Sequence, residues 1–150
     1  MIHPHVQTIF CDDIRHEVNG KFSCIGIYSN SLFVESFPIT LPKLCVAVSV
    51  VLPLIKPVEQ IKLVVRLDDE VLTEEITPEE IIESIGQAYE STPEELRHKK
   101  LFITRLMVEF SPLVLKASGD MKVRAYVDDD VLHGVSLTID QKPQEKLAQQ

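Results

Sequence analysis

The sequence predicts a mainly β protein, in which two antiparallel sheets pack into a sandwich of the immunoglobulin-like or C2-like kind. Three observations predict this fold. Most segments alternate apolar and polar residues, an Asn-Gly pair lies between two such segments, and only the stretch around residues 78–97 carries helix signals. A partly open barrel is the alternative arrangement of the same strands. The chain has no tryptophan, which excludes an antibody-type domain with its Cys…Trp…Cys signature.

The first predicted element is a β-hairpin near the N-terminus. Residues 6–14 form its first arm, and Asn19-Gly20 forms its turn before a second arm that begins at residue 21. A type I′ turn needs positive φ at both central positions, and Asn and Gly accept that conformation most easily. The Asn-Gly pair therefore predicts a type I′ hairpin.

The next strands follow from their apolar patterns. Residues 43–52 are almost all apolar and rich in valine, which is typical of a strand buried on both faces. In residues 61–68 every second position is apolar, so one face of this strand is expected to be buried. A short acidic turn then leads into a strand over residues 71–76.

One segment has helical spacing instead of alternation. Thr77-Pro78-Glu79-Glu80 combines an N-cap, a proline at the first helical position and a glutamate at the capping-box position, which predicts a helix from Pro78 to Glu90. A second start signal at residues 91–95 predicts a short helical turn that ends near Arg97. Residues 61–100 hold 5 basic and 11 acidic side chains, and acidic residues at helix N-termini account for part of this excess.

Three further strands complete the predicted fold. Residues 101–110 form one, and Pro112 marks a bend or a change of pairing partner. Residues 121–127 and 131–139 form a closing hairpin around an aspartate turn. In the last strand, one face is predicted to carry Val131, His133, Val135, Leu137 and Ile139. The chain is therefore expected to form a single β-sandwich domain over residues 1–140, with a polar C-terminal tail over residues 141–150.

Composition and charge restrict the expected environment. The 150 residues include 15 basic and 23 acidic side chains, so the formal net charge is −8. An acidic surface suits neither nucleic-acid phosphates nor an anionic membrane, and we expect neither as a partner. No secretion signal and no apolar run of bilayer-spanning length is present, and three cysteines fit neither a disulfide framework nor a zinc knuckle. We expect a cytoplasmic protein with buried free thiols.

Three motifs in the first third of the chain resemble those of a known family. They read Phe10-Cys11-Asp12-Asp13-Ile14-Arg15-x-Glu17, Gly20-Lys21-x-Ser23-x-Ile25-Gly26-Ile27-Tyr28 and Phe37-Pro38-x-x-Leu41-Pro42-Lys43-Leu44-Cys45. This opening is similar to that of a bacterial family, with phage-encoded members left open, that is known only as a domain of unknown function. Residues 123–139 resemble it more loosely. The resemblance implies a mostly β cytoplasmic protein and supplies no activity, cofactor or catalytic residue.

The densest set of ionisable groups on a predicted strand is Asp12, Asp13, Arg15 and Glu17. Alternation places Asp13, Arg15 and Glu17 on one side, so Arg15 can pair with either carboxylate. A salt-bridged strand face is the simpler interpretation of this cluster. A recognition site for a partner peptide or a ligand is the functional interpretation.

Signals for metal binding and catalysis are weak. His3-Pro4-His5 has no third ligand, and the acidic turns at residues 68–70 and 128–130 lack the spacing of an EF-hand. The chain has no P-loop, HExxH, nucleophile elbow or dinucleotide fingerprint. We therefore expect no metal site, no cofactor and no catalytic residue.

The function expected from these observations is that of a non-catalytic interaction module that acts through protein–protein contact, including self-association as a homodimer. The expected contact surface is the helical stripe of Ile81, Ile82, Ile85 and Tyr89, or the strand over residues 101–110 beside it. Two alternatives remain. One is a small-ligand or ion-binding protein that uses the loops at one end of the sandwich, and the other is a hydrolase-type enzyme on the Asp12–Glu17 face.

Overall fold

Alternating apolar side chains give twelve strands within residues 2–143, the part of the chain that the computed structural model describes. The elements in chain order are β1 (His5–His16), the 3-10 turn η1 (Val18–Gly20), β2 (Phe22–Ile27), β3 (Ser31–Val34), β4 (Ile39–Leu41), β5 (Leu44–Pro53), β6 (Ile61–Leu67), β7 (Glu70–Ile76), α1 (Glu79–Ser91), η2 (Glu94–Lys99), β8 (Leu101–Phe110), β9 (Leu113–Leu115), β10 (Gly119–Val127), β11 (Asp130–His133) and β12 (Leu137–Gln141). The protein is mainly β, as the sequence predicts.

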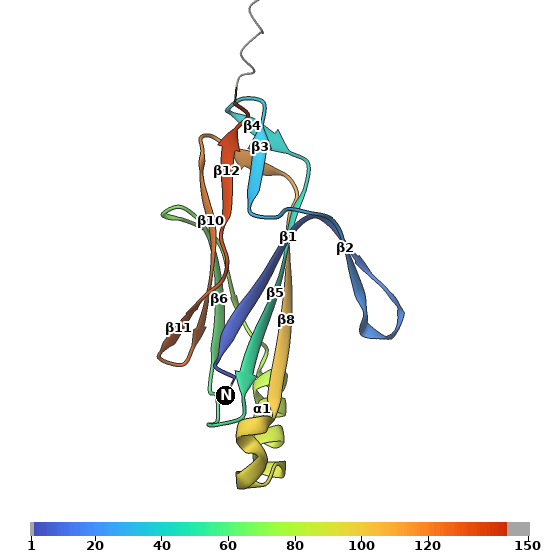
Figure 1. The fold of residues 1–150 in the computed structure, drawn as a ribbon, viewed down its shortest axis with the longest axis vertical. Coiled ribbons are helices and arrows are strands. Elements are labelled where there is room, and N and C mark those ends of the chain that lie inside the picture. Colours follow the sequence, from blue (N-terminus) through green and yellow to red (C-terminus); the bar gives the residue numbers. More distant parts are fainter. Residues whose placement is uncertain (1, 144–150) are drawn as a thin grey trace, which may run out of the picture.

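Two sheets form the layers of a β-sandwich (Figure 1). Sheet A has the order β2-β1-β5-β8, and all its pairs are antiparallel. Sheet B has the order β3-β12-β10-β6-β7, with β11 also paired to β10, and β4 pairs with β9 in a small separate sheet. One pair differs from the expected antiparallel arrangement, because β3 and β12 run parallel.

The core lies between the two sheets. Val46 and Val48 of β5 belong to the same buried cluster as Met121 and Val123 of β10. Ile85 of α1 is fully buried in this cluster, so the helix closes one end of the sandwich with an apolar side chain. None of the helices in the described residues is long and apolar enough to cross a membrane.

The first hairpin has the predicted turn. Asn19 and Gly20 have φ values of 61° and 71°, and the amide of Lys21 donates to the carbonyl of Val18 at 3.5 Å. The last residue of β1 that pairs with β5 is Cys11. Beyond it, β1 pairs only with β2, and the arm that they form projects from the body of the sandwich (Figure 1).

The helix forms where the sequence predicts it, but the predicted cap does not. No side chain caps α1, and Thr77 lies in the position before its N-cap residue, Pro78. The amide of Thr77 donates to the carbonyl of Ile61 at 2.9 Å, while its buried hydroxyl has no hydrogen-bond partner. Thr77 therefore extends the pairing of β6 and β7 instead of capping the helix.

The last predicted strand is divided in two. Val131, His133 and Val135 are exposed, whereas Leu137 and Ile139 are buried, so the prediction of one shared face is wrong. The reason is a break over residues 134–136: β11 pairs with one end of β10, and β12 pairs with the other end. Where the chain leaves one pairing and enters another, the alternation can shift by one residue. Side chains at the positions that faced the solvent before the break then face the core after it.

The predicted polar tail begins later than residue 141. Gln141 is the last residue of β12, and the amide of Lys142 donates to the carbonyl of Val34 at 2.8 Å. The remainder of the predicted tail, residues 144–150, lies outside the described residues.

Candidate functional site

The predicted cluster on β1 divides between two environments. Asp13 accepts a hydrogen bond from the Lys43 ammonium at 2.7 Å, and Asp12 accepts one from the Tyr28 hydroxyl. Arg15 makes no ion pair with Asp13 or Glu17 in the described structure, so the expected pairing is wrong. The partner of Asp13 comes instead from the residue just before β5, because antiparallel pairing of β1 and β5 brings those positions together.

Lys43 joins two carboxylates at one end of sheet A. Its ammonium lies 2.7 Å from Asp13 Oδ1 and 2.8 Å from Glu109 Oε1. The hydrogen bond from Lys43 is the largest cause that lowers the pKa of Asp13, and the two carboxylates in turn raise the pKa of Lys43. Asp13 and Lys43 therefore stay charged near neutral pH, and the ion pairs of Lys43 tie β1 to β8 across β5.

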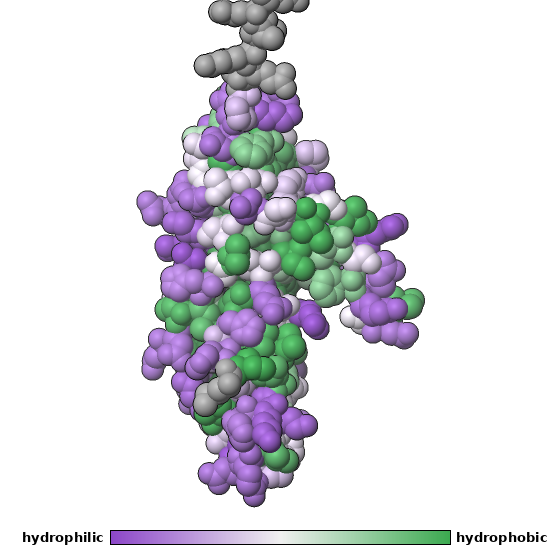
Figure 2. All heavy atoms as spheres, in the orientation of Figure 1, coloured by the Kyte–Doolittle hydropathy of each residue, from purple (hydrophilic) through white to green (hydrophobic). Residues whose placement is uncertain are grey.

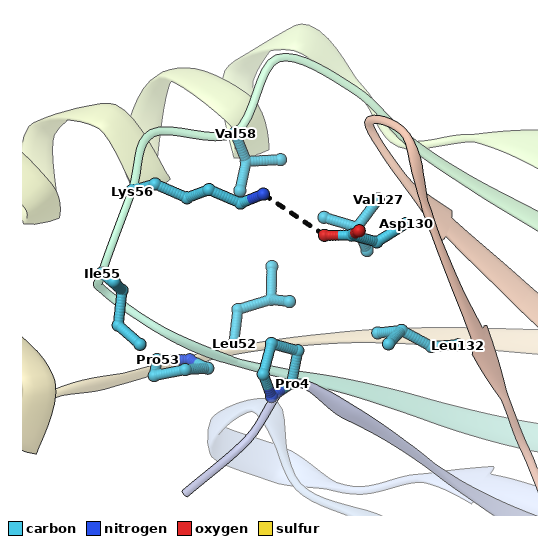
Figure 3. A pocket seen from close by; sticks show the side chains of 9 residues that line it. All are labelled: Pro4, Leu52, Pro53, Ile55, Lys56, Val58, Val127, Asp130 and Leu132. Atoms are coloured by element: carbon cyan, nitrogen blue, oxygen red, sulfur yellow. Dashed lines mark hydrogen bonds and ion pairs between the residues drawn. The ribbon is translucent and has the colours of Figure 1, made fainter. Parts of the chain in front are cut away.

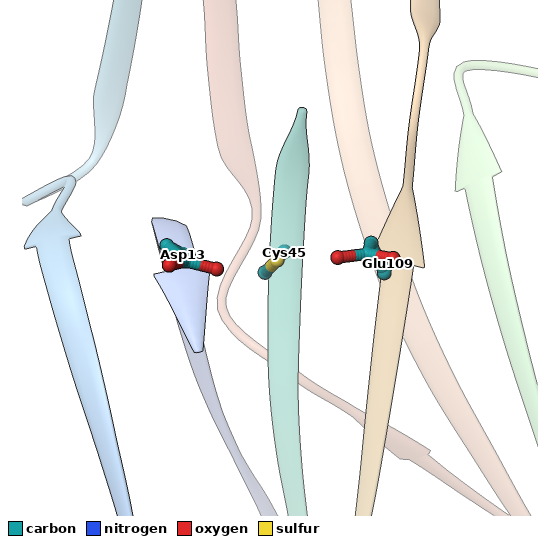
Figure 4. A group of neighbouring side chains, drawn as sticks. All are labelled: Asp13, Cys45 and Glu109. Carbon is teal, nitrogen blue, oxygen red and sulfur yellow. The ribbon is translucent and has the colours of Figure 1, made fainter. Parts of the chain in front are cut away.

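Cys45 lies between the two carboxylates (Figure 4). Its Sγ atom and one oxygen each from Asp13 and Glu109 all lie within 4.8 Å of one another, which is close to the spacing of metal ligands. Burial raises the pKa of the Cys45 thiol, and the ammonium of Lys43 already provides the cation between the carboxylates. The arrangement favours an internal ion pair over a metal centre.

A second thiol lies beside the first. Cys11 is directly opposite Cys45 in the sheet, and both side chains are buried. Burial is the largest cause that raises the pKa of Cys11 to about 12, and the nearby Cys24 raises it further. A thiol with this pKa stays protonated at neutral pH, so it is a poor nucleophile. All three cysteines are free.

The outer part of the cluster sits on the projecting arm. Glu17 accepts a hydrogen bond from the hydroxyl of Ser23 at 3.2 Å, and both Glu17 and Arg15 are exposed. Asp12, Asp13, Arg15 and Glu17 therefore do not converge on one pocket.

The predicted helical stripe is largely used inside the molecule. Ile85 is fully buried, and Ile81 and Ile82 pack against the core. Tyr89 is half-buried, and the guanidinium of Arg97 lies 3.9 Å from the centre of its ring. The apolar surface of the stripe that stays accessible to a partner therefore consists of the partly exposed Ile81, Ile82 and Tyr89.

The acidic turns bind backbone amides. Asp68 accepts a hydrogen bond from the amide of Asp120, and Asp128 accepts from the amides of Glu59 and Gln60 at 3.0 and 2.9 Å. Asp68 and Asp128 have positive φ values, 50° and 53°, which aspartate accepts in turns. These contacts give the turns a structural role.

A small, enclosed cavity lies at the end of the sandwich near the N-terminus (Figure 3), and larger, more open hollows of about 290 to 590 Å³ lie elsewhere on the surface. The enclosed cavity measures about 120 Å³ and has a mainly apolar lining that includes Leu52, Val58 and Leu132. Lys56 and Asp130 form an ion pair of 3.2 Å at its side. Ligand pockets usually measure about 300 Å³ or more, so this cavity suits only a very small apolar group.

The edge strands of the two large sheets differ strongly, and β11, which within residues 2–143 pairs only with β10, is a short edge strand of four residues. β3 has four residues, β2 contains Gly26 with positive φ, and β7 carries a bulge opposite Val65 and Arg66 together with three glutamates. Such features protect an edge from pairing with another chain. β8 has none of them: it pairs one to one with β5 over ten residues, and in the described structure no strand pairs with its other side.

The outer faces of the two sheets also differ. On sheet A, the positions of β5 that face away from the core are small or apolar and are themselves buried, as at Cys45, Ala47 and Val51, whereas Ile103 of β8 is exposed beside them. On sheet B, the corresponding positions of β10 are Lys122, Arg124 and Tyr126. Exposed Ile25 and Ile27 extend the apolar surface onto the arm, and Figure 2 shows apolar surface gathered at the base of that arm.

Sequence reasoning missed Lys43 as the partner of Asp13 and Glu109 as the second carboxylate on Lys43. It also missed the contrast between the edge strands. The pairing order of strands is a long-range property, and no local pattern in the sequence encodes it. The strand over residues 101–110, by contrast, was one of the two surfaces expected for association.

The comparisons with known proteins identify a family and no activity. A family model described as a family of unknown function (DUF6941) matches residues 7–140, in agreement with the resemblance of the opening motifs to an uncharacterised family. No curated protein and no solved structure matches the chain.

Proposed function

The chain belongs to this family of unknown function, and we propose that it is a non-catalytic interaction module that binds proteins through the free edge of β8 and the adjoining outer face of sheet A. The observation that carries the proposal is the contrast among the edge strands of the two large sheets. β8 is the longest of them, and it lacks the bulge, the positive-φ glycine and the cluster of like charges found on the others.

A free edge offers a row of backbone donors and acceptors, and an added strand can satisfy them. The apolar face beside β8 supplies side-chain contacts that such pairing alone lacks. Ile103, with 44% of its surface exposed, and the half-buried Met107 lie on this face. Together they provide a contact surface that is both directional and apolar.

The two alternatives have less support. The enclosed cavity of about 120 Å³ suits at most a very small ligand, the larger hollows are open to solvent, and the acidic turns already bind backbone amides. A hydrolase that uses a carboxylic acid of the Asp12–Glu17 face as its general acid needs a raised pKa there, whereas the hydrogen bond from Lys43 lowers the pKa of Asp13. We keep three finer expectations with the proposal: an immunoglobulin-like or C2-like topology, a cytoplasmic location, which free cysteines favour, and a bacterial or phage origin.

Two matched substitutions test the proposed surface. Ile103→Lys places a charge on the outer face of β8, and Val71→Lys places the same charge on β7, where Val71 is 43% exposed. Proteins that bind the wild type in quantitative affinity capture are expected to bind the Val71→Lys variant equally and to be lost from the Ile103→Lys variant. Calorimetry with each purified partner then measures the change in affinity directly.

Thermal unfolding of both variants serves as the control for folding. Equal partner binding by the two variants, or loss of binding only in the Val71→Lys variant, contradicts the assignment of β8 as the contact strand.

A further inference from the structure

β8 carries two opposite charges at positions that face the same side. Arg105 and Glu109 both point to the outer face of sheet A, because they lie opposite Ser49 and Cys45 of β5. Arg105 has no ion-pair partner in the described structure, and 56% of the Glu109 side chain is exposed. The spacing of these two charges restricts which strand can pair with the edge of β8, and in which register.

We propose that the partner of β8 is β8 of a second copy, paired antiparallel about a two-fold axis that passes beside Met107. This inference rests on the proposed role of the β8 edge and names its occupant. In this register, Arg105 lies opposite Glu109 of the partner subunit, and Glu109 lies opposite Arg105 of the partner subunit. Because the interface is symmetric, Arg105 and Glu109 of each copy form two ion pairs across it.

The two-fold axis limits the possible registers. An axis perpendicular to the sheet keeps the outer faces of both copies on the same side, so residues of the outer face must lie opposite each other. An axis beside Arg105 would place Arg105 opposite Arg105 of the partner subunit, which is repulsive. An axis beside Leu106 or Val108 would leave the charges without opposite partners. The register about Met107 is the one with charge complementarity.

The same register is favourable for the apolar side chains. The half-buried Met107 meets its own copy on the axis of the outer face. On the core side, Leu106 lies opposite Val108 of the partner subunit, so apolar side chains face each other there too. The paired segment is residues 104–110, the part of β8 that lies away from α1 (Figure 1). Sheets A of the two copies then form one continuous sheet of eight strands.

Charge reversal tests this register with the full-length protein. Sedimentation velocity is measured on the wild type and on the variants Arg105→Glu and Glu109→Arg, at concentrations up to about 0.5 mM so that weak association is detected. The wild type is expected to dimerise. Each variant alone brings like charges together twice, and its dimer dissociation constant is expected to rise about tenfold or more.

Mixing the two variants is the decisive measurement. In a heterodimer of Arg105→Glu with Glu109→Arg, both charge pairs are again opposite, so the mixture is expected to recover a dissociation constant close to that of the wild type. Lys122→Glu on sheet B changes the net charge as much as Arg105→Glu does, and it is expected to leave the dimer unchanged. Circular dichroism confirms that each variant is folded.

Three outcomes overturn the inference. A wild type that is monomeric at about 0.5 mM removes the second copy as the occupant. If captured partners still depend on Ile103 in that case, the proposed function stands and only its occupant is different. A dimer that neither charge reversal weakens, or single variants that do not recover on mixing, places the interface elsewhere or in another register.

Discussion

Gly20 and Gly86 illustrate how one residue type can have opposite roles. A side chain at either position would meet no atom within 4 Å, so space does not distinguish them. Gly20 has a φ of 71°, which a β-branched residue strongly disfavours, whereas Gly86 lies inside α1 with no positive φ. Backbone conformation alone therefore decides the effect of a substitution at each position.

The first prediction is that Gly20→Val lowers the free energy of unfolding by about 1–3 kcal/mol, because valine is strained at positive φ. Gly86→Ala, the matched control, is expected to raise it by about 0.5–1 kcal/mol, because alanine favours the helix. Urea unfolding measures both changes. A Gly20→Val protein as stable as the wild type would show that the turn does not hold this conformation in solution.

The second prediction concerns alkaline pH and Cys11. Burial raises the pKa of this thiol from 9.0 to about 12, so the folded protein keeps a proton that the unfolded chain releases above pH 9. Stability is then complete below pH 9 and falls as the pH rises toward 12. Between pH 8 and 10 we expect a loss of about 1 kcal/mol, smaller in the variant Cys11→Ala. Tyr28, whose pKa rises from 10.0 to about 12 through burial, acts in the same direction at higher pH.

Urea unfolding at pH 8, 9 and 10 measures this effect in the wild type and in the Cys11→Ala variant. Cys24→Ala is expected to reduce the effect only in part, because burial, and not Cys24, is the largest cause of the raised pKa of Cys11. If the free energy of unfolding falls with pH equally in the wild type and in the Cys11→Ala variant, another group causes the loss of stability at alkaline pH.

At the scale of the element, the apolar stripe of α1 can either anchor the helix to the core or form a contact surface for a partner. The sequence suggested that Ile81, Ile82, Ile85 and Tyr89 offered more apolar surface than a short helix needs for its own anchoring. In the structure, Ile85 is fully buried, and Ile81 and Ile82 contact the core. Ile85 is the one buried residue of α1, so this side chain anchors the helix to that end of the sandwich. The use of the helix as an interface stays a prediction, with Tyr89 as the residue to probe.

The third prediction separates these two uses of α1. Ile85→Ala is expected to cost about 2–5 kcal/mol of unfolding free energy, because it leaves a cavity in the core. Tyr89→Ala is expected to cost about 1 kcal/mol or less through the lost contact with Arg97. Thermal and urea unfolding measure both values, and sedimentation of the Tyr89→Ala variant shows whether association uses this face. Similar losses in the two variants would contradict the assignment of Ile85 as the anchor.

At the scale of the whole molecule, local patterns in the sequence predicted the elements, and long-range pairing decided their arrangement. The strands over residues 61–67 and 121–127 and the turn at Asn19-Gly20 follow from a period of two and from turn chemistry, which are local properties. The parallel pairing of β3 with β12 and the contact of Lys43 with Glu109 join residues far apart in the chain, so no local pattern contains them.

For the candidate site too, the residues could be predicted from the sequence, but their long-range contacts could not. Asp13 was selected because ionisable residues cluster around it, yet its partner Lys43 is 30 residues away. The strand over residues 101–110 was selected because it lies beside the predicted helix, whereas its position at a free edge depends on the order of the strands in sheet A. The sequence can thus show that a residue is a candidate for the site, whereas the residues that it contacts follow only from the fold.

The projecting arm has a consequence for the motions of the protein. Past Cys11, β1 pairs only with β2, and an isolated two-stranded hairpin is marginally stable in water. β5, in contrast, has a paired neighbour on each side. Backbone amides of residues 13–16 and 22–25 should therefore exchange with deuterium through local opening, well before those of β5, which need the whole sandwich to unfold. The arm is free to open and close repeatedly in solution while the remainder of the molecule keeps its shape.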